Sequence, residues 1–358
     1  MAESKQYPGY PSGRRARLLA LIEQFAGKRV LVVGDMVADE YIFGSPFSVS
    51  REAPVLVLRH RAQSIVPGGA INPGVNARTL GAEVFLAGVI GDDAPGDGVR
   101  VRLHEYGVEM AGLFNEPGRP TSTKTRILAG DAQLAQQQIV RVDRIDTSDL
   151  GDECKRQILA YVRETLPTVD ALILSDYENG VISPEILEAA IQPALRLGKI
   201  VVVDSHGDLA RFQGVTALTP NQPEAESAVG WKISDRASLE RAGARLLEMT
   251  TAHAILITRG SEGMSLFQRD RTPLHLPALS VEVADPTNAG AAVAATFTLA
   301  LATDPALSAA TVADGALLAN IAASLVVQRI GCATNTPAEL AAAVRALVGD
   351  DGAGVGES

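Results

Sequence analysis

The chain has few cysteines and few aromatic residues. Cys154 and Cys332 are its only cysteines among 358 residues, and aromatic residues make up 4% of the sequence. Two cysteines this far apart provide no disulfide framework, and no Cys/His cluster has the spacing of a zinc site. We therefore expect a fold stabilised by an aliphatic core rather than by disulfides or a structural metal.

Positive charge is scarce as well. Lys and Arg number 32 against 42 Asp and Glu, and the formal net charge is −10. This balance argues against nonspecific binding to nucleic acid or to an anionic membrane. The sequence also lacks a long transmembrane run, and its first residues lack the apolar core of a signal peptide. We therefore expect no nucleic-acid or membrane partner, and a cytoplasmic protein.

Short aliphatic runs are abundant, and hydrophobic residues make up 46% of the chain. Most of the runs end in Gly, Asp or Asn and are followed by a stretch with helical spacing. Runs without polar alternation are typical of strands buried on both faces. They predict an α/β fold with a mostly parallel central sheet flanked by helices. The runs are residues 28–35, 83–92, 171–177, 199–207, 216–221 and 254–260.

Two segments break this pattern. Residues 36–66 and 119–146 alternate polar and apolar side chains, which predicts a small, half-exposed sheet projecting from the main body. Ligands of open α/β sheets bind beyond the carboxyl ends of the strands. A projecting sheet at that place can close over the crevice as a β lid.

Polar residues follow several of the predicted strands. Asp35 and Asp39 come after the first one, where they either bind a ligand's hydroxyl groups or form a solvated turn. Gly69 and Asn72 follow another, where the backbone either approaches a ligand closely or makes a tight turn. The segment 257–267 reads as a strand, a Gly-flanked turn and a second strand, which either borders a nucleotide or is an ordinary hairpin.

Asn221 and Glu224 are spaced i, i+3 after the run at 216–221. On the first turn of a helix they face the same side and can order Mg²⁺-bound waters beside phosphates. The alternative is a helix cap, in which Glu224 completes a capping box with Asn221. Taken alone, this pair favours the cap.

The stretch "VADPTNAGAAVAATFTLAL", residues 283–301, has the composition of a phosphate cradle. Small residues ahead of a helix let backbone N–H groups approach an anion, and the helix N-terminus adds partial positive charge. Phosphoryl transfer also needs an acceptor for the proton of the attacking hydroxyl. Immediately after Gly290, where that acceptor is expected, the sequence has Ala291.

Taken in order, these segments resemble the ribokinase-like (PfkB) family of carbohydrate kinases over about residues 14–345. Within that family the chain is most similar to the bacterial heptose-7-phosphate kinases of lipopolysaccharide-core synthesis. We expect one domain over this range, a flexible tail at residues 1–13 and a disordered, Gly-rich tail at 346–358. The resemblance rests on "KRVLVVGDMVADEY", "SREAPVLVL", "PGGAINPGVNARTLGAEV", "RPTSTKTRILAG", "QIVRVDRID", "LSDYENGV", "LTPNQPEAE", "ITRGSEGMSLF" and residues 285–291.

The resemblance implies transfer of the γ-phosphate of ATP to a sugar or sugar-phosphate hydroxyl, with Mg²⁺ and often a monovalent cation. It also implies a homodimer formed through the lid. The residues it assigns to the sugar are Asp35, Asp39, Gly69 and Asn72, with Thr123, Lys124 and Arg126 of the lid near the sugar's far end. Those it assigns to the nucleotide are Asn221 and Glu224 (with Mg²⁺, through water), Thr258, Gly260, Gly263 and Asn320.

The sequence departs from the family pattern at the anion hole. The family's Gly-Ala-Gly-Asp is here Asn288, Ala289, Gly290 and Ala291, and the missing Asp is the catalytic base. Two lysines near the expected substrate phosphate are also replaced, in the pairs 178–179 and 205–206. Three hypotheses remain open: a working kinase with an altered base, a pseudokinase that binds sugar or nucleotide in a regulatory role, and a different enzyme class on the same fold.

Overall fold

The computed structural model describes residues 13–130, 137–329 and 331–348. The tails expected at residues 1–13 and 346–358 therefore lie outside the described residues, except for Gly13 and residues 346–348. The last helix, α10 (Pro337–Leu347), continues two residues beyond the predicted end of the domain.

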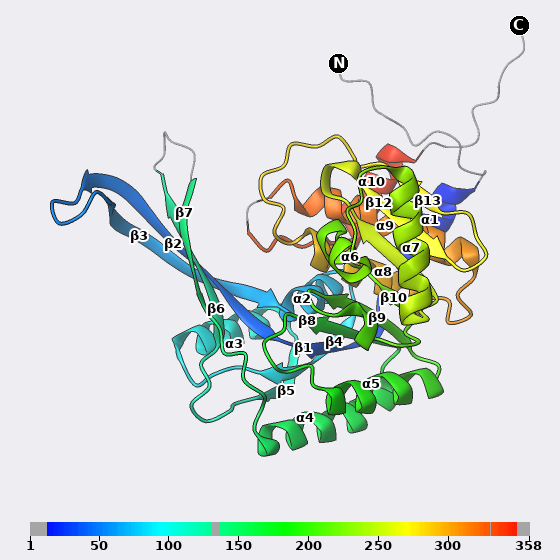
Figure 1. Cartoon of the computed structure of the whole chain (residues 1–358), viewed down its shortest axis with the longest axis horizontal. Coiled ribbons are helices and arrows are strands. Elements are labelled where there is room, and N and C mark those ends of the chain that lie inside the picture. The colour runs from blue at the N-terminus through cyan, green and yellow to red at the C-terminus, as the bar shows by residue number, and fades with distance from the viewer. Residues whose placement is uncertain (1–12, 131–136, 330, 349–358) are drawn as a thin grey trace, which may run out of the picture.

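A nine-stranded sheet forms the centre of the molecule, in the order β13-β12-β11-β10-β9-β8-β1-β4-β5 (Figure 1). The strands from β5 to β11 are parallel, and β12 and β13 are antiparallel additions at one edge. Every predicted aliphatic run forms a strand of this sheet, so the predicted α/β class is confirmed. The strands are β1 (Arg29–Gly34), β4 (Glu83–Val89), β5 (Glu109–Phe114), β8 (Ala171–Asp176), β9 (Ile200–Ser205), β10 (Ala217–Leu218), β11 (Ala254–Thr258), β12 (Met264–Gln268) and β13 (Leu274–Leu276).

Helices cover both faces of the sheet, because alternate strand residues point into two separate cores. In β1, Val30 and Val32 belong to one core, and Leu31 and Val33 to the other. Around the first core lie α1 (Arg14–Glu23), α2 (Ile71–Thr79), α3 (Ala94–Tyr106), α8 (Ala289–Ala302), α9 (Ala309–Val326) and α10. Around the second lie α4 (Asp152–Thr165), α5 (Pro184–Arg196), α6 (Gln222–Val229) and α7 (Arg236–Thr250).

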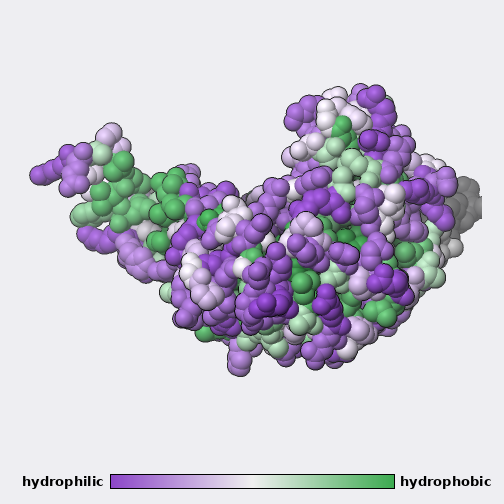
Figure 2. All heavy atoms as spheres, turned by 60° about the horizontal axis from the view of Figure 1, so that its bottom comes forward, coloured by the Kyte–Doolittle hydropathy of each residue, from purple (hydrophilic) through white to green (hydrophobic). Residues whose placement is uncertain are grey.

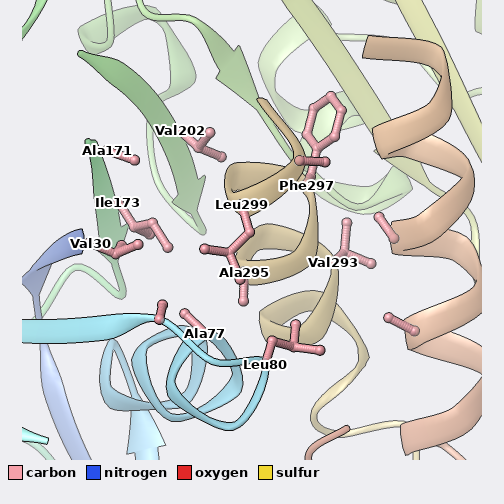
Figure 3. Close-up of a cluster of buried hydrophobic side chains, with 14 of the residues drawn as sticks. Val30, Ala77, Leu80, Ala171, Ile173, Val202, Val293, Ala295, Phe297 and Leu299 are labelled. Carbon is pink, nitrogen blue, oxygen red and sulfur yellow. The ribbon is translucent and has the colours of Figure 1, made fainter. Parts of the chain in front are cut away.

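Helix α8 packs directly against the middle of the sheet. Figure 3 shows Val30, Ile173 and Val202 from three neighbouring strands pointing towards this helix. Its small side chains let it approach the strands closely, and residues 291–302 are all buried. Full burial of its larger side chains, such as Val293, Phe297 and Leu299, stabilises the fold by roughly 1.5–3 kcal/mol each. The packing fixes the N-terminus of α8 at one end of the sheet.

Helix α9 is an exception to the expectation that the chain has no membrane-spanning stretch. Among the described residues it is the one helix long and apolar enough to cross a membrane. In the structure, however, 67% of its residues are buried inside the protein, as in the core helix of a globular fold.

A four-stranded sheet, β3-β2-β6-β7, projects from the body (Figure 1). It comprises β2 (Met36–Val49), β3 (Leu56–Gly69), β6 (Ser122–Ala129) and β7 (Gln137–Arg144). The two segments predicted to form the lid thus pair as a separate sheet. Only Asp35 separates β1 from β2, so the lid continues directly from a central strand.

The two faces of the lid differ in polarity. Paired residues on neighbouring strands lie on the same face of a sheet. One face carries Asp39, Lys124 and Asp143, which are paired across β2, β6 and β7. The opposite face carries Ile42, Ile127, Val140 and Val142, together with Glu40 and Thr125 in the row of Val142.

Candidate active site

One large cavity, of about 1090 Å³, lies between the polar face of the lid and the carboxyl ends of the central strands. This is the position at which open α/β sheets bind ligands. Most of the predicted site residues line it, although they come from segments far apart in the sequence. They are Asp39, Gly69, Asn72, Lys124, Arg126, Asn221, Glu224, Thr258, Gly260, Gly263, Ala289, Gly290, Ala291 and Asn320.

Three predicted residues are not among those that line the cavity. The Asp35 carboxylate is 1% exposed and accepts hydrogen bonds from backbone N–H groups of the loop that follows β8. Thr123 is buried and donates its hydroxyl to the carbonyl of Thr121. Asn288 is buried at the N-cap of α8. The assigned sugar contacts of Asp35 and Thr123 therefore stay predictions that the cavity does not support.

At the lid end of the cavity, Asp39 forms a buried ion pair with Arg126 across β2 and β6. The loop from β3 to α2 approaches this pair. Gly69 has a φ of +55°, and an added Cβ would lie 2.5 Å from the carbonyl oxygen of Asp35, so only glycine fits there. The chain can therefore turn tightly enough to bring Asn72 to the wall of the cavity.

At the opposite end, the N-terminus of α8 opens into the cavity. A Cβ added at Gly290 would have no neighbour within 4 Å, so an anion can approach the backbone N–H groups here. The preceding turn is held by Asp285, which accepts hydrogen bonds from the N–H of Thr287 (2.9 Å) and of Gly331 (3.0 Å). The first turn of α8 carries no acidic residue, and Ala291 itself lines the cavity.

Asn288 ties this helix end to the loop before α10. Its Nδ2 donates to the carbonyl oxygen of Ala333, whereas its buried Oδ1 has no partner within the described residues. A glycine could not make this bond. Asn288 therefore adds a hydrogen bond at this helix end that a glycine would lack.

The spacing of Asn221 and Glu224 gives the cap that the pair alone favours, and their Mg²⁺ role stays a prediction. They form a complete capping box at the start of α6, and both side chains also line the cavity. The Glu224 carboxylate accepts from the N–H of Asn221 (2.8 Å), from its Nδ2 (2.6 Å) and from His206 Nδ1. The hydrogen bond to Glu224 raises the pKa of His206.

The predicted strand–turn–strand at 257–267 is present as β11, a turn and β12, and the turn forms a further wall of the cavity. Gly260 and Gly263 adopt φ values of +53° and +86°, which suit glycine. Asn320 of α9 reaches this wall and donates to the carbonyl of Pro277 (2.9 Å). Apolar residues complete the surface, which is suited to a flat ring system. They include Leu279, Val281, Val293, Ala323 and Val327.

Sequence reasoning missed Tyr177, Asp204 and Arg141 as members of the cavity wall. Tyr177 and Asp204 stand at the carboxyl ends of β8 and β9, so the rule that singled out Asp39 would have found them. Arg141 lies directly opposite Arg126 in the lid, and strand register is needed to place it.

Asp204 gives a pH-dependent prediction. Its burial raises the pKa of the carboxyl to about 6, His206 opposes this rise and Glu224 adds to it. The folded state therefore favours the protonated Asp204 carboxyl more strongly than the unfolded state does. This contribution to stability is fully present below pH about 4 and is lost as the pH rises through about 6. Relative to Asp204→Asn, the wild-type chain should lose on the order of 2–3 kcal/mol of unfolding free energy between these limits. Urea unfolding of both proteins across this range measures the difference, and a pH-independent difference would contradict the prediction.

Comparison with known proteins gives the family of the chain. Residues 28–339 match the pfkB family carbohydrate kinase model. The chain is 42% identical over 314 residues to the bifunctional protein HldE of Geobacter metallireducens, and 39% identical over 322 residues to that of Desulfatibacillum aliphaticivorans. These alignments cover 87% and 90% of the chain but only 61% and 64% of the relatives. The chain thus spans less than two thirds of their length.

Solved structures show the same fold. Escherichia coli phosphofructokinase-2 in complex with potassium superposes with a TM-score of 0.71 at 18% identity, covering 90% of this chain and 99% of that one. Arabidopsis thaliana ribokinase complexed with ribose and ATP gives 0.68 at 18% identity, covering 89% and 99%. Because the family match spans most of the sequence, the chain belongs to the pfkB family of carbohydrate kinases.

Proposed function

We propose that this protein binds ATP and a sugar phosphate of the heptose 7-phosphate type, in the cytoplasm, for phosphoryl transfer to a sugar hydroxyl. The observation that carries this proposal is the single cavity that joins the polar lid face to the N-terminus of α8. A sugar held by the lid would present its hydroxyl to a phosphate held by the helix end. The heptose class rests on the resemblance of the sequence to heptose-7-phosphate kinases.

Residues at the lid end are suited to a phosphorylated sugar. Asp39 and Asn72 offer acceptors and donors for hydroxyl groups. Lys124 and Arg141 add positive charge on the same wall, where a substrate phosphate would need cationic partners. In this proposal Lys124 and Arg141 replace the two lysines that the resemblance to heptose kinases leads us to expect at positions 179 and 206.

The residues present also fit a magnesium ion that is bound mainly by nucleotide phosphates and water. Glu224 accepts three hydrogen bonds, which leaves one of about four acceptor positions of its carboxylate for a metal-bound water. No group of three metal-ligating side chains occurs among the residues that the structure describes. Mg²⁺ commonly keeps several waters and binds through substrate phosphates rather than through a cage of side chains, and here it would neutralise charge on the transferring phosphate. The proposal includes a monovalent cation, in line with the potassium complex of E. coli phosphofructokinase-2.

The alternative is a pseudokinase, and Ala291 is the observation that favours it. General-base catalysis contributes about 10² to 10⁴ in rate, so its loss leaves binding intact and turnover slow. Titration calorimetry with ATP·Mg²⁺ and with heptose 7-phosphate, together with a phosphoryl-transfer assay on the same samples, separates the two. Binding of both ligands with weak turnover fits the pseudokinase, whereas binding of neither contradicts both proposals.

We further propose that the protein forms a homodimer through the outer face of the lid. Val140 and Val142 on this face are exposed. Figure 2 shows apolar side chains gathered on the projecting sheet. Exposed apolar patches of this kind typically mark protein–protein contacts. Because the opposite face lines the cavity, a second copy on the outer face would leave the site accessible.

Val142→Glu should therefore convert the dimer to a monomer, because it places a charge in the apolar contact. Sedimentation velocity of the wild type and the variant at the same concentration measures the change. Val101→Glu is the matched control, since Val101 is an exposed valine on α3, outside the lid. A monomeric wild type, or equal effects of the two variants, would contradict the interface.

A further inference from the structure

Tyr177 is the first residue after β8, and the body of the protein fixes its backbone. Its N–H donates to Asp35 Oδ2 at 2.7 Å, and the same carboxylate accepts from the N–H groups of Asn179 and Val181, both at 3.1 Å. The carboxylate is buried, so water does not compete for these bonds. The position of Tyr177 is thus set by the central sheet.

The ring of Tyr177 is the place where lid and body meet inside the cavity. Lys124, from lid strand β6, has its Nζ 5.0 Å from the ring centroid. His206, which follows β9, packs edge-on against the ring with centroids 4.4 Å apart. All three side chains line the cavity. The aromatic face attracts the ammonium electrostatically and so limits its positions.

Lys124 forms no ion pair within the described part of the chain. The carboxylates that share its lid face are engaged elsewhere, since Asp39 pairs with Arg126 and Asp143 pairs with Arg141. Burial lowers the pKa of Lys124, as expected for an ammonium without a close counter-ion. An ammonium has three N–H donors, so one resting on a ring face still has donors for an anion.

We infer that Tyr177 is a positioning residue that holds Lys124 for the anionic group of the sugar substrate. The inference rests on the proposed function and adds a determinant of specificity to it. Tyr177 thereby favours a phosphorylated sugar over the same sugar without phosphate.

The test compares the affinities of heptose 7-phosphate and heptose by titration calorimetry. Tyr177→Leu removes the ring face and should weaken heptose 7-phosphate about tenfold, with less than a twofold effect on heptose. Tyr177→Phe keeps the ring and should retain most of the affinity. If the leucine variant does not fold, Tyr177→Met replaces it, because methionine also lacks the ring, and the same selective loss is expected. Equal weakening of the two ligands would show a merely structural role and overturn the inference.

Lys124→Met completes a double-mutant cycle. If the ring acts through Lys124, the combined Lys124→Met and Tyr177→Leu variant binds heptose 7-phosphate no more weakly than Lys124→Met alone. Additive losses overturn the inference. Phe47→Leu is the matched control, because it removes a remote lid contact in which Arg59 lies 4.1 Å over the ring.

Inorganic phosphate separates a failure of this inference from a failure of the proposed function. Suppose that wild type binds neither heptose 7-phosphate nor heptose, but binds phosphate. If both Tyr177→Leu and Lys124→Met weaken the binding of phosphate, the proposed substrate is wrong and the inference holds. If wild type binds neither heptose ligand, and phosphate also fails to bind or binds without sensitivity to either substitution, the inference is wrong.

Discussion

Ala291→Asp is expected to raise kcat for phosphoryl transfer by about 10² to 10⁴, because it supplies a carboxylate that can accept the hydroxyl proton. Residue 291 lines the cavity in the first turn of α8, where a negative charge is also favoured by the helix dipole. A coupled ATP assay with heptose 7-phosphate measures the effect. Because the change adds a side chain at the cavity wall, the KM for the sugar is measured at the same time.

Ala291→Asn is the matched control, since it has nearly the same shape and cannot act as a base. Equal rates for the Asp and Asn variants would contradict a role for the missing base. If Asp alone has no effect, a second change, Asn288→Gly, tests whether the bond from Asn288 to Ala333 holds the anion hole in an unproductive shape. Recovery only in the combined variant would assign the deficit to that bond.

Asp39→Ala is expected to lower the unfolding free energy by about 3–5 kcal/mol, because it leaves Arg126 buried without its carboxylate. The side chains of Asp39 and Arg126 are 5% and 10% exposed, so water replaces little of the lost interaction. Urea unfolding of wild type and variant measures the loss. The same change should abolish sugar binding, because Asp39 lines the lid end of the cavity.

Asp143→Ala provides the comparison for this prediction. It removes a carboxylate from the same lid face, but its partner Arg141 is half exposed, so the expected cost is about 1 kcal/mol or less. Replacing both buried partners, with Asp39→Leu and Arg126→Met, should cost less than Asp39→Ala alone. Equal losses for Asp39→Ala and Asp143→Ala would show that burial of the pair does not matter.

The sequence alone predicted the body of this fold because its strands are buried on both faces. Runs such as residues 28–35 and 199–207 have no polar alternation, and this pattern leaves few alternatives to a covered parallel sheet. The lid was predicted for the opposite reason, since its segments alternate. The order of its strands, β3-β2-β6-β7, could not be predicted because it depends on pairings between distant segments.

The site was predicted less evenly than the fold. Asp35 and Asp39 looked equivalent in the sequence, yet Asp35 stands at the junction of β1 and β2, buried against the loop after β8, whereas Asp39 lies within β2 and lines the cavity. For Asn221 and Glu224 the two alternatives offered by the sequence coincide, since the same residues form a local capping box and line the cavity. Local patterns identify which residues can act, and the sheet decides which way each one points.

The single residue between β1 and β2 also joins the lid to a loop of the body. Asp35 stands at this junction, and its carboxylate holds the loop that carries Tyr177. The residue from which the lid starts is thus also the residue that positions the Tyr177 loop, and a substitution at Asp35 would affect both elements at once.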